Sequence, residues 1–255
     1  NYAFATFTDG VLTVGQKALT VTADAKTKVY GAANPALTAT ITGFANGETL
    51  ATSGVTGAAS VTTTATALTG VGSATLTAAV GNLVSANYAF ATFTDGVLTI
   101  TKAPLTVTAN PVGRAYGAAN PALTATLTGF VNGETLGTSG VTGTATVTTT
   151  ATLTSPATTY VITPALGDLA AANYAFATFT DGVLTVGQKA LTITADAKTK
   201  IYGAANPVLT ATITGFANGE TLATSGITGA ASVTTTVTAL TGVGSATLTA
   251  AVGNL

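Results

Sequence analysis

The chain has 255 residues, but only 7% of them are charged, with 8 basic and 9 acidic side chains. Soluble domains usually carry about 25% charged residues, so the sequence offers no electrostatic footprint for nucleic acid or anionic lipid. His, Cys, Met and Trp are all absent, which removes the imidazole base, the thiolate and the soft metal ligands of many active sites. We therefore expect no enzyme activity, no cofactor, no metal site and no nucleic-acid partner.

The chain opens with NYAFATFTDG, which has neither a basic start nor a long apolar run. A secretory signal needs both features, so we expect any export signal to lie outside this window. Further along, Thr repeatedly interrupts the apolar residues, and no stretch reaches the ~18 consecutive apolar residues of a membrane helix. The sequence therefore predicts no membrane span.

The words NYAFATFTDGVLT begin at Asn1 and return at Asn87 and Asn173, which gives a repeat of 86 residues without insertion or deletion. The first and third copies differ at only 5 aligned positions, and each difference exchanges one apolar residue for a slightly larger one. A packed interior tolerates such exchanges best. A chain that copies one unit in this way is typical of repeat architectures.

The hydrophobic pattern within one unit has a period of two residues. In ALTVTAD, Leu19, Val21 and Ala23 alternate with threonines, and residues 36–42 and 73–79 alternate in the same way. This pattern is typical of strands with one buried and one solvated face, and glycine-rich turn signals separate the runs. We predict tandem small β-sandwiches of immunoglobulin-like kind, each with about six or seven short antiparallel strands.

One segment departs from this pattern. NGETLATS at 46–53 places Asn46 as a helix N-cap and Glu48 near the favourable end of a helix dipole. It predicts one short helix or 3₁₀ turn, and a β-grasp-like α+β unit is the alternative fold. The charged words DAKTK at 24–28 and 196–200 are expected to be solvated strand edges that oppose unwanted pairing.

Large apolar residues at the inward positions of the first unit form the predicted core. They are Tyr2, Phe4, Phe7, Leu12, Tyr30, Leu37, Ile41, Phe44, Val61, Leu76 and Val80. The words YGAANP are interpreted as structural turns, because Gly and Asn-Pro favour turn conformations. The turn residues are Tyr30, Gly31, Asn34, Pro35, Tyr116, Gly117, Asn120, Pro121, Tyr202, Gly203, Asn206 and Pro207.

No motif carries catalytic chemistry. GVLTVGQKA contains a glycine-rich stretch with a lysine, but a phosphate-binding loop needs Gly-Lys followed by Ser or Thr, whereas Gln16 intervenes and Ala18 follows. Paired carboxylates for glycoside hydrolysis lie about 5 to 10 Å apart, whereas Asp9, Asp24 and Glu48 fall in different turns or strand ends. Calcium would require several carboxylates in one loop, and none has them.

The words YGAANPALTATLTGFVNGETL at 116–136, TTYVITPALGDLAAANYAF at 158–176 and DGVLTITKAPLTVTA at 95–109 resemble the MBG repeat of YGX type. This repeat is found in very large bacterial surface and secreted proteins, and the resemblance covers the whole chain. In the family pattern a unit begins near KAPLTVTA and ends with GVLTITKA. The resemblance therefore implies complete repeats at 16–101 and 102–187, the closing strands of a preceding repeat at 1–15, and a repeat without closing strands at 188–255.

The resemblance implies a structural protein, secreted or on the bacterial cell surface. Our first hypothesis is the stalk of an adhesin or extracellular fibre, in which repeats are rigid spacers and the chain associates with copies of itself. The alternative is a module that binds cell-surface or matrix glycans. The joints that set the pitch between repeats are predicted at Gly15, Gln16, Lys17, Thr101, Lys102, Ala103, Gly187, Gln188 and Lys189.

In this frame each end of the chain exposes strand edges, and the first residues also expose apolar side chains, a combination that favours association. Two arrangements satisfy both ends. Either the chain continues covalently into further repeats, or separate chains complete each other by donating strands head to tail. We favour covalent continuation, because the length falls 3 residues short of three periods of 86, and denaturing electrophoresis distinguishes the two.

Overall fold

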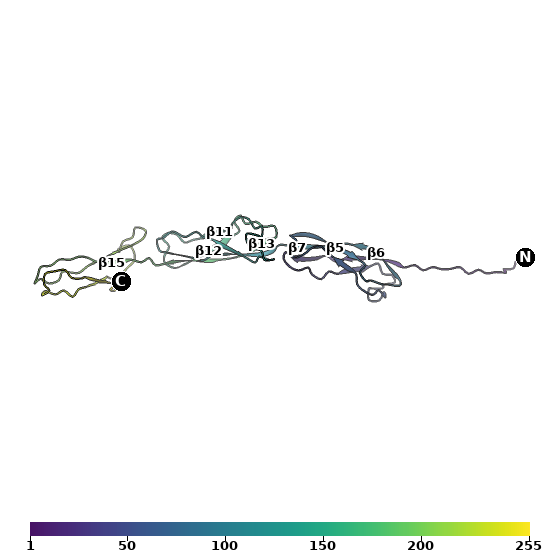
Figure 1. Cartoon of the computed structure of the whole chain (residues 1–255), viewed down its shortest axis with the longest axis horizontal. Helices are drawn as coiled ribbons and strands as arrows, with labels where there is room; N and C mark the ends of the chain where they lie inside the picture. The colour runs from purple at the N-terminus through teal and green to yellow at the C-terminus, as the bar shows by residue number, and fades with distance from the viewer. The chain divides into compact units, whose positions relative to one another are not determined.

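The computed structural model describes residues 1–255, which form 18 strands and no helix (Figure 1). The chain divides into two compact units. The first unit contains residues 1–106, 127–144 and 167–178, and the second contains 107–126, 145–166 and 179–255. The predicted all-β class of tandem repeats is confirmed, and each unit is described below by itself.

The first repeat lies in the first unit and forms seven strands. They are β1 (Lys17–Ala23), β2 (Lys26–Val29), β3 (Ala39–Thr42), β4 (Ser60–Thr62), β5 (Gly72–Ala79), β6 (Tyr88–Thr94) and β7 (Gly96–Thr101). One sheet has the strand order β3-β1-β6, and the other has β2-β7-β5-β4. Figure 1 labels β5, β6 and β7 of this repeat.

The last two strands, β6 and β7, close the repeat, and we call residues 87–101 the closing segment. β6 runs parallel to β1, and β7 runs parallel to β2 while it pairs antiparallel with β5 on its other side. The closing segment therefore lies beside the first two strands along their whole length. It is an edge of one sheet and an interior strand of the other, so both sheets depend on it.

This parallel register fixes where the chain leaves the repeat. Lys17 pairs with Tyr88 at the start of β1, whereas Val29 pairs with Thr101 at the end of β2. About 13 residues, at about 3.3 Å per residue, make roughly 40 Å of strand path between these two points. Thr101 thus emerges at the opposite end of the repeat from Lys17, and the next repeat begins there.

The core of the first repeat comes from alternating positions of the paired strands. Leu19, Val21, Leu76, Leu98 and Ile100 are all buried. Their spacing of two residues within a strand places them on the inward face, while the threonines between them face outward. Burying each such side chain contributes about 1.5–3 kcal/mol relative to exposure, and the closing segment supplies two of these five.

The second repeat follows the same plan. Its strands are β8 (Ala103–Ala109), β9 (Val112–Ala115), β10 (Ala125–Thr128), β11 (Thr146–Thr149), β12 (Thr159–Ala165), β13 (Tyr174–Thr180) and β14 (Gly182–Gly187). The sheet orders, β10-β8-β13 and β11-β12-β14-β9, match those of the first repeat. In the second unit, Ile162, Leu184 and Val186 form the centre of a buried cluster with Ala109 and Ala151.

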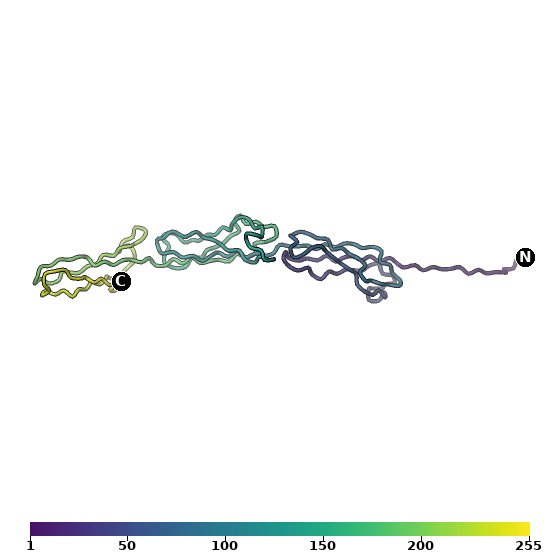
Figure 2. The backbone as a smooth tube through the Cα atoms, in the orientation of Figure 1, coloured from purple at the N-terminus to yellow at the C-terminus, as the bar shows by residue number.

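The third repeat, in the second unit, has only four short strands: β15 (Thr192–Ala195), β16 (Ala211–Thr214), β17 (Ser232–Thr234) and β18 (Thr249–Ala251). They form two separate two-stranded sheets, β15-β16 and β17-β18. No side chain between residues 188 and 255 is fully buried. The backbone path of this repeat, towards the yellow end of the chain, is seen in Figure 2.

The structure corrects the prediction of a helix at 46–53, and with it the β-grasp alternative. Asn46 and Gly47 both adopt positive φ, at 53° and 72°, and two successive left-handed residues cannot start a right-handed helix. The segment forms turns instead, in which the Ser53 amide donates to the Thr49 carbonyl over 2.9 Å. Glu48 is bound by the Tyr88 hydroxyl rather than placed on a helix dipole.

The prediction of purely antiparallel strands was also wrong, because each complete repeat pairs its closing strands parallel to its opening strands. The hydrophobic pattern within a strand does not reveal which strand it pairs with. The paired opening and closing strands lie about 70 residues apart in the first repeat. The predicted immunoglobulin-like sandwich is therefore not confirmed. The repeats are all-β units built from two small sheets.

The predicted core was correct only in part. Tyr30 and Leu76 are buried. Leu37 and Val61 are partly exposed and pack against the core. Ile41 and Phe44 are also partly buried. By contrast, Val80 is exposed, and so are Tyr2, Phe4, Phe7 and Leu12. Residues 1–16 form one extended segment that contains no strand, as the purple end of the tube in Figure 2 shows.

Candidate functional site: the joints between repeats

A single residue separates the last strand of the first repeat from the first strand of the second. β7 ends at Thr101 and β8 begins at Ala103, so only Lys102 lies between them. The Lys102 ammonium donates to the Ala171 carbonyl over 2.8 Å, and the Ala103 amide donates to the Asn173 carbonyl over 3.0 Å. The link is thus extended, short and hydrogen-bonded, which leaves little freedom for bending at this point.

The Tyr-Gly turn of the first repeat lies at this same end. The Ala32 amide donates to the Val29 carbonyl over 3.1 Å, and Gly31 has a φ of +84°, a conformation that residues with a Cβ rarely adopt. The Tyr30 amide donates to the Thr101 carbonyl over 2.8 Å. This turn therefore projects the Tyr30 side chain beside the end of β7, toward the following repeat.

The carboxylate of Glu134 binds two tyrosine hydroxyls, one from each repeat. The Tyr30 hydroxyl donates to Glu134 Oε1 over 2.6 Å, and the Tyr174 hydroxyl donates to Glu134 Oε2. The Val131 amide in turn donates to the Tyr174 hydroxyl over 3.2 Å. Charge-assisted hydrogen bonds of this kind are stronger than neutral ones, so one side chain ties the two repeats together.

The rings around this carboxylate pack closely. Tyr30 and Tyr174 meet edge to face with ring centroids 5.6 Å apart, and Phe130 and Tyr174 do the same at 5.5 Å. Such aromatic pairs contribute about 0.5–1.5 kcal/mol beyond their buried area. Gly31 lies so close to Val131 that a Cβ at residue 31 would overlap its side chain. The joint is therefore a packed contact as well as a hydrogen-bonded one.

The hydrogen bonds shift the ionisation of all three groups. Those from Tyr174 and Tyr30 lower the pKa of the Glu134 carboxyl below its ordinary value. The bond to Glu134 raises the pKa of the Tyr30 hydroxyl. Burial, followed by the bond to Glu134, raises the pKa of Tyr174 to about 12. Glu134 is thus held ionised, and both tyrosines are held protonated, across the neutral pH range.

Two further hydrogen bonds cross the same joint. The Asn132 side-chain amide donates to the Ala67 carbonyl over 3.3 Å, and the Val71 amide donates to Asn173 Oδ1 over 3.0 Å. Asn173 precedes Tyr174 in the sequence NYAF, so two adjacent residues of the second repeat form hydrogen bonds at this joint. Residues from three repeated sequence motifs, YGA, NGE and NYAF, therefore meet at the first joint.

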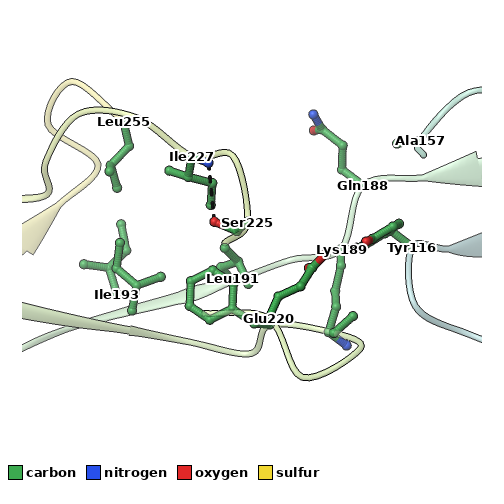
Figure 3. A pocket seen from close by; sticks show the side chains of 13 residues that line it. Tyr116, Ala157, Gln188, Lys189, Leu191, Ile193, Glu220, Ser225, Ile227 and Leu255 are labelled. Atoms are coloured by element: carbon green, nitrogen blue, oxygen red, sulfur yellow. Dashed lines mark hydrogen bonds between the residues drawn. The ribbon is translucent and has the colours of Figure 1, made fainter. Parts of the chain in front are cut away.

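The second unit contains a joint with the same design. The Tyr116 hydroxyl donates to Glu220 Oε1 over 2.6 Å, at the same spacing of 104 residues that separates Tyr30 from Glu134. A Cβ at Gly117 would overlap Ala217, which stands where Val131 does in the first joint. Figure 3 shows Tyr116 and Glu220 facing each other beside Lys189. Glu220 binds one tyrosine in this chain, where Glu134 binds two.

The structure places the residues predicted as turns and joints as follows. Tyr116 and Gly117 form the same turn as Tyr30 and Gly31, and so do Tyr202 and Gly203. Asn34, Asn120 and Asn206 each donate from their side-chain amide to a carbonyl 31 residues further on, over 2.7 Å. The three prolines follow these asparagines without a strand of their own.

Among the predicted joint residues, Gln16 donates from its side chain to the Ser85 and Ala86 carbonyls, over 3.3 and 3.1 Å. The Lys17 amide donates to the Asn87 carbonyl over 3.0 Å. Gly187 accepts from the Tyr116 amide over 2.8 Å, and Gln188 and Lys189 line a cavity beside it. Gly15 lies in the extended, exposed segment.

Sequence reasoning did not identify the glutamates of the joints, because the helix prediction had already placed Glu48 near the favourable end of a helix dipole. The available signal was the constant spacing between Tyr-Gly in one repeat and Asn-Gly-Glu in the next. A spacing that is preserved across repeats but spans their boundary indicates a contact between them. Tyr30 was predicted only as a turn and core residue, and the structure adds its hydroxyl to the joint.

Comparison with protein families supports the repeat assignment. The family model for the MBG domain (YGX type) matches residues 19–99, 105–185 and 191–254. These three ranges cover most of the chain and follow the same period as the strands described above. No curated protein matches the sequence. The chain forms no helix, and therefore none that could span a membrane.

Proposed function

Because the chain belongs to the MBG domain (YGX type) family, with three tandem copies, we propose that it is a non-catalytic structural spacer in a bacterial adhesin or extracellular fibre. MBG repeats are consistent with extracellular repeat-type surface proteins. More specifically, the repeats form a stalk in which each repeat holds the next in a fixed orientation. In such a role the joints perform the function, and the repeats supply the length.

The observation that carries this proposal is the joint around Glu134. A flexible linker between domains contains several polar or glycine residues and few contacts across it. Here one residue links the strands, Glu134 binds a tyrosine from each side, and Gly31 lets Val131 approach closely. Each of these features restricts rotation between the first two repeats, as a load-transmitting spacer requires.

The spacer role is testable by measuring distances across this joint. The chain has no Cys, so spin labels attached at Thr75→Cys in β5 and Thr178→Cys in β13 report one distance by pulsed electron resonance. We expect a single narrow distance distribution for the parent chain and a broad one after Glu134→Ala. The control Thr92→Ala, an exposed position in β6, should leave the width unchanged. A broad distribution in the parent would contradict the rigid spacer.

The alternative function, binding of cell-surface or matrix glycans, has weaker support. Glycan-binding sites usually present exposed aromatic rings, whereas Tyr30, Tyr88 and Tyr174 are buried and their hydroxyls are engaged by glutamates. Binding of the chain to defined glycans on an array would favour this alternative over the spacer.

A further inference from the structure

The first repeat is entered and left through strands that lie side by side. β1 and β2 form one nearly continuous stretch, residues 17–29, because only Asp24 and Ala25 separate them. β6 and β7 form another, residues 88–101, because only Asp95 separates them. β1 lies parallel to β6 over six residue pairs, and β2 lies parallel to β7 over four. The two stretches therefore form one parallel ladder, which passes from one sheet into the other.

The chain enters and leaves this parallel ladder at opposite ends. Lys17 is paired at its start, and Thr101 is paired at its end. A pull on both ends of the repeat therefore draws the opening stretch toward its N-terminus and the closing stretch toward its C-terminus. Because the stretches run in the same direction, this pull makes them slide past each other. The hydrogen bonds of a parallel ladder are evenly spaced between the strands, so they share the load in shear.

The antiparallel strand pairs are not on this load path. β3 pairs with β1, β4 pairs with β5, and β5 pairs with β7, but β3, β4 and β5 contain neither end of the repeat. In a hairpin whose two loaded ends lie side by side, the bonded pairs open one after another. Parallel pairing of the opening and closing strands avoids this geometry, since it separates the two loaded ends by the length of the ladder.

Two features of the ladder oppose sliding. The register shifts between Leu19 and Thr20, where Ala91 of β6 has no partner, and a bulge of this kind pins the register of the strands around it. In addition, Leu98 and Ile100 of β7 are buried. A slip of one residue would turn their side chains to the opposite face of the sheet. The ladder therefore cannot move by small steps without losing core contacts.

The load passes to the second repeat without slack, because only Lys102 separates β7 from β8. The second repeat has the same arrangement of opening and closing strands. β14 runs parallel to β9, with Leu184 paired to Val112 and Gly187 paired to Ala115. β13 lies next to β8 in the other sheet. Both complete repeats thus place their closing strands beside their opening strands.

We propose that each complete repeat is a tension-bearing unit, in which the parallel ladder resists a pull along the chain as a shear clamp. The repeat keeps its length under load, and it extends abruptly when the ladder ruptures. This inference rests on the proposed spacer function, since a spacer is under tension when the structures at its two ends are pulled apart. It adds resistance to force to the fixed orientation described above.

The spacer and the clamp are tested separately. The distance measurement across the first joint reports the freedom of rotation between two repeats in the unloaded chain. The measurements below report the force that ruptures a single repeat. A mobile joint between strong repeats would contradict the spacer alone, and a rigid joint between weak repeats would contradict the clamp alone.

The first test pulls the full chain in an optical trap. The chain has no Cys, and a Cβ at Gly15 meets nothing within 4 Å, so Gly15→Cys can carry one handle. With the second handle at Ala190→Cys, an exposed position after β14, the pull runs along both complete repeats, and we call it the axial pull. We expect two abrupt events, each of which releases roughly 250 Å of chain at about 3.4 Å per residue.

The matched control changes only the direction of the pull. The second handle is moved to Ala86→Cys, which is also an exposed position. Both handles then lie at the same end of the ladder, because the Lys17 amide donates to the Asn87 carbonyl over 3.0 Å. This peeling pull separates β1 from β6 one pair at a time. Forced unfolding is governed by the unfolding rate, so at one loading rate peeling should rupture the first repeat at less than about half the force of either axial event.

The second test compares two leucines of the same core. Leu19 in β1 and Leu76 in β5 are 1% and 0% exposed, so replacing either with Ala should cost comparable equilibrium stability. Leu19 belongs to the parallel ladder, whereas Leu76 does not. Under a constant axial force, Leu19→Ala should raise the rupture rate of the first repeat by about 30-fold. Leu76→Ala should raise it by less than about threefold, because β5 keeps its contacts until the ladder slips.

Three results would overturn the proposal. They are a rupture force that does not depend on the direction of the pull, a gradual axial extension without abrupt events, and equal acceleration by Leu19→Ala and Leu76→Ala. If an Ala variant does not fold, the comparison of axial and peeling pulls decides, because it uses the unchanged core.

Discussion

The first and third repeats have nearly the same sequence but different structures. Residues 16–83 and 188–255 differ at only 5 positions, yet the first forms two sheets of three and four strands with residues 88–101 in place, and the third forms two pairs of short strands. β1 has 7 residues, whereas its counterpart β15 has 4, and β5 has 8 where β18 has 3. Leu76 is completely buried in the first repeat, whereas the aligned Leu248 is partly exposed.

The comparison shows that the closing segment decides how far the strands extend. It pairs with β1 in one sheet and lies between β2 and β5 in the other. Without such a partner, the segment aligned with β2 has no strand at all. Backbone groups that would donate to the closing segment lose their partners, and the apolar faces on either side of it stay open. The repeat boundary that matters structurally thus lies after this segment.

The largest expected effect comes from moving the boundary of an isolated repeat. A fragment of residues 16–101 contains all seven strands and should unfold cooperatively in urea. A fragment of residues 1–86 contains the same closing words at the wrong end, where the parallel register cannot be reached, and should show no cooperative transition. A more stable 1–86 fragment would contradict this account of the closing segment.

The next effect concerns two neighbouring positions of β7. In the 16–101 fragment, Leu98→Asp places a carboxylate in the core and should lower the free energy of unfolding by at least about 3 kcal/mol. Val97→Asp, one residue away on the exposed face, should cost less than about 1 kcal/mol. Equal losses, measured by urea titration, would show that the β7 register is different from the one described.

A smaller effect is expected at the first joint. Tyr30→Phe removes the hydroxyl that donates to Glu134, and a net loss of about 1 kcal/mol is expected in a fragment of residues 16–187. The same substitution in the 16–101 fragment should have little effect, because Glu134 is not in that fragment. If both fragments lost the same amount, the bond between repeats would not contribute to stability.

The smallest effect is on pH dependence. The pKa of Glu134 is lowered by its tyrosine partners, so its contribution is complete above the unfolded pKa of about 4.3 and is lost as the pH falls through the lowered folded value. In the 16–187 fragment, the stability difference between the parent and Glu134→Gln should therefore shrink as the pH falls below about 4. A stability difference between the parent and Glu134→Gln that grew on acidification would contradict the lowered pKa of Glu134.

The sequence predicted those parts of the fold that depend on local pattern. Alternation around Leu19 and Val21 predicted strands, and Gly31 predicted a turn, because both signals act within a few residues. Pairing could not be predicted in this way, since Tyr88 meets Lys17 across about 70 residues of chain and nothing local specifies a parallel partner. The exposure of Tyr2 and Leu12 was missed for the same reason.

The chemistry of the joints could not be predicted from the sequence. Lys102 and Gln16 lie where the spacing of the repeats placed them, and their hydrogen bonds to carbonyls could not be seen in the sequence. Lys28 was expected to be solvated but is buried, because its ammonium donates to the Ala32 and Thr66 carbonyls over 3.1 and 2.6 Å. Long side chains reach carbonyls set by tertiary structure, which a pattern of charges does not describe.

The central claim is that the closing segment completes a repeat, and amide hydrogen exchange of the chain tests it most directly. Peptic peptides containing Val21 or Ile193 differ by one methylene, so mass spectrometry separates the first and third repeats. We expect slow exchange in 18–24 and fast exchange in 190–196, and addition of free NYAFATFTDGVLTIT should slow only the latter. Equal protection of both segments before the peptide is added, or no change afterwards, would contradict the claim.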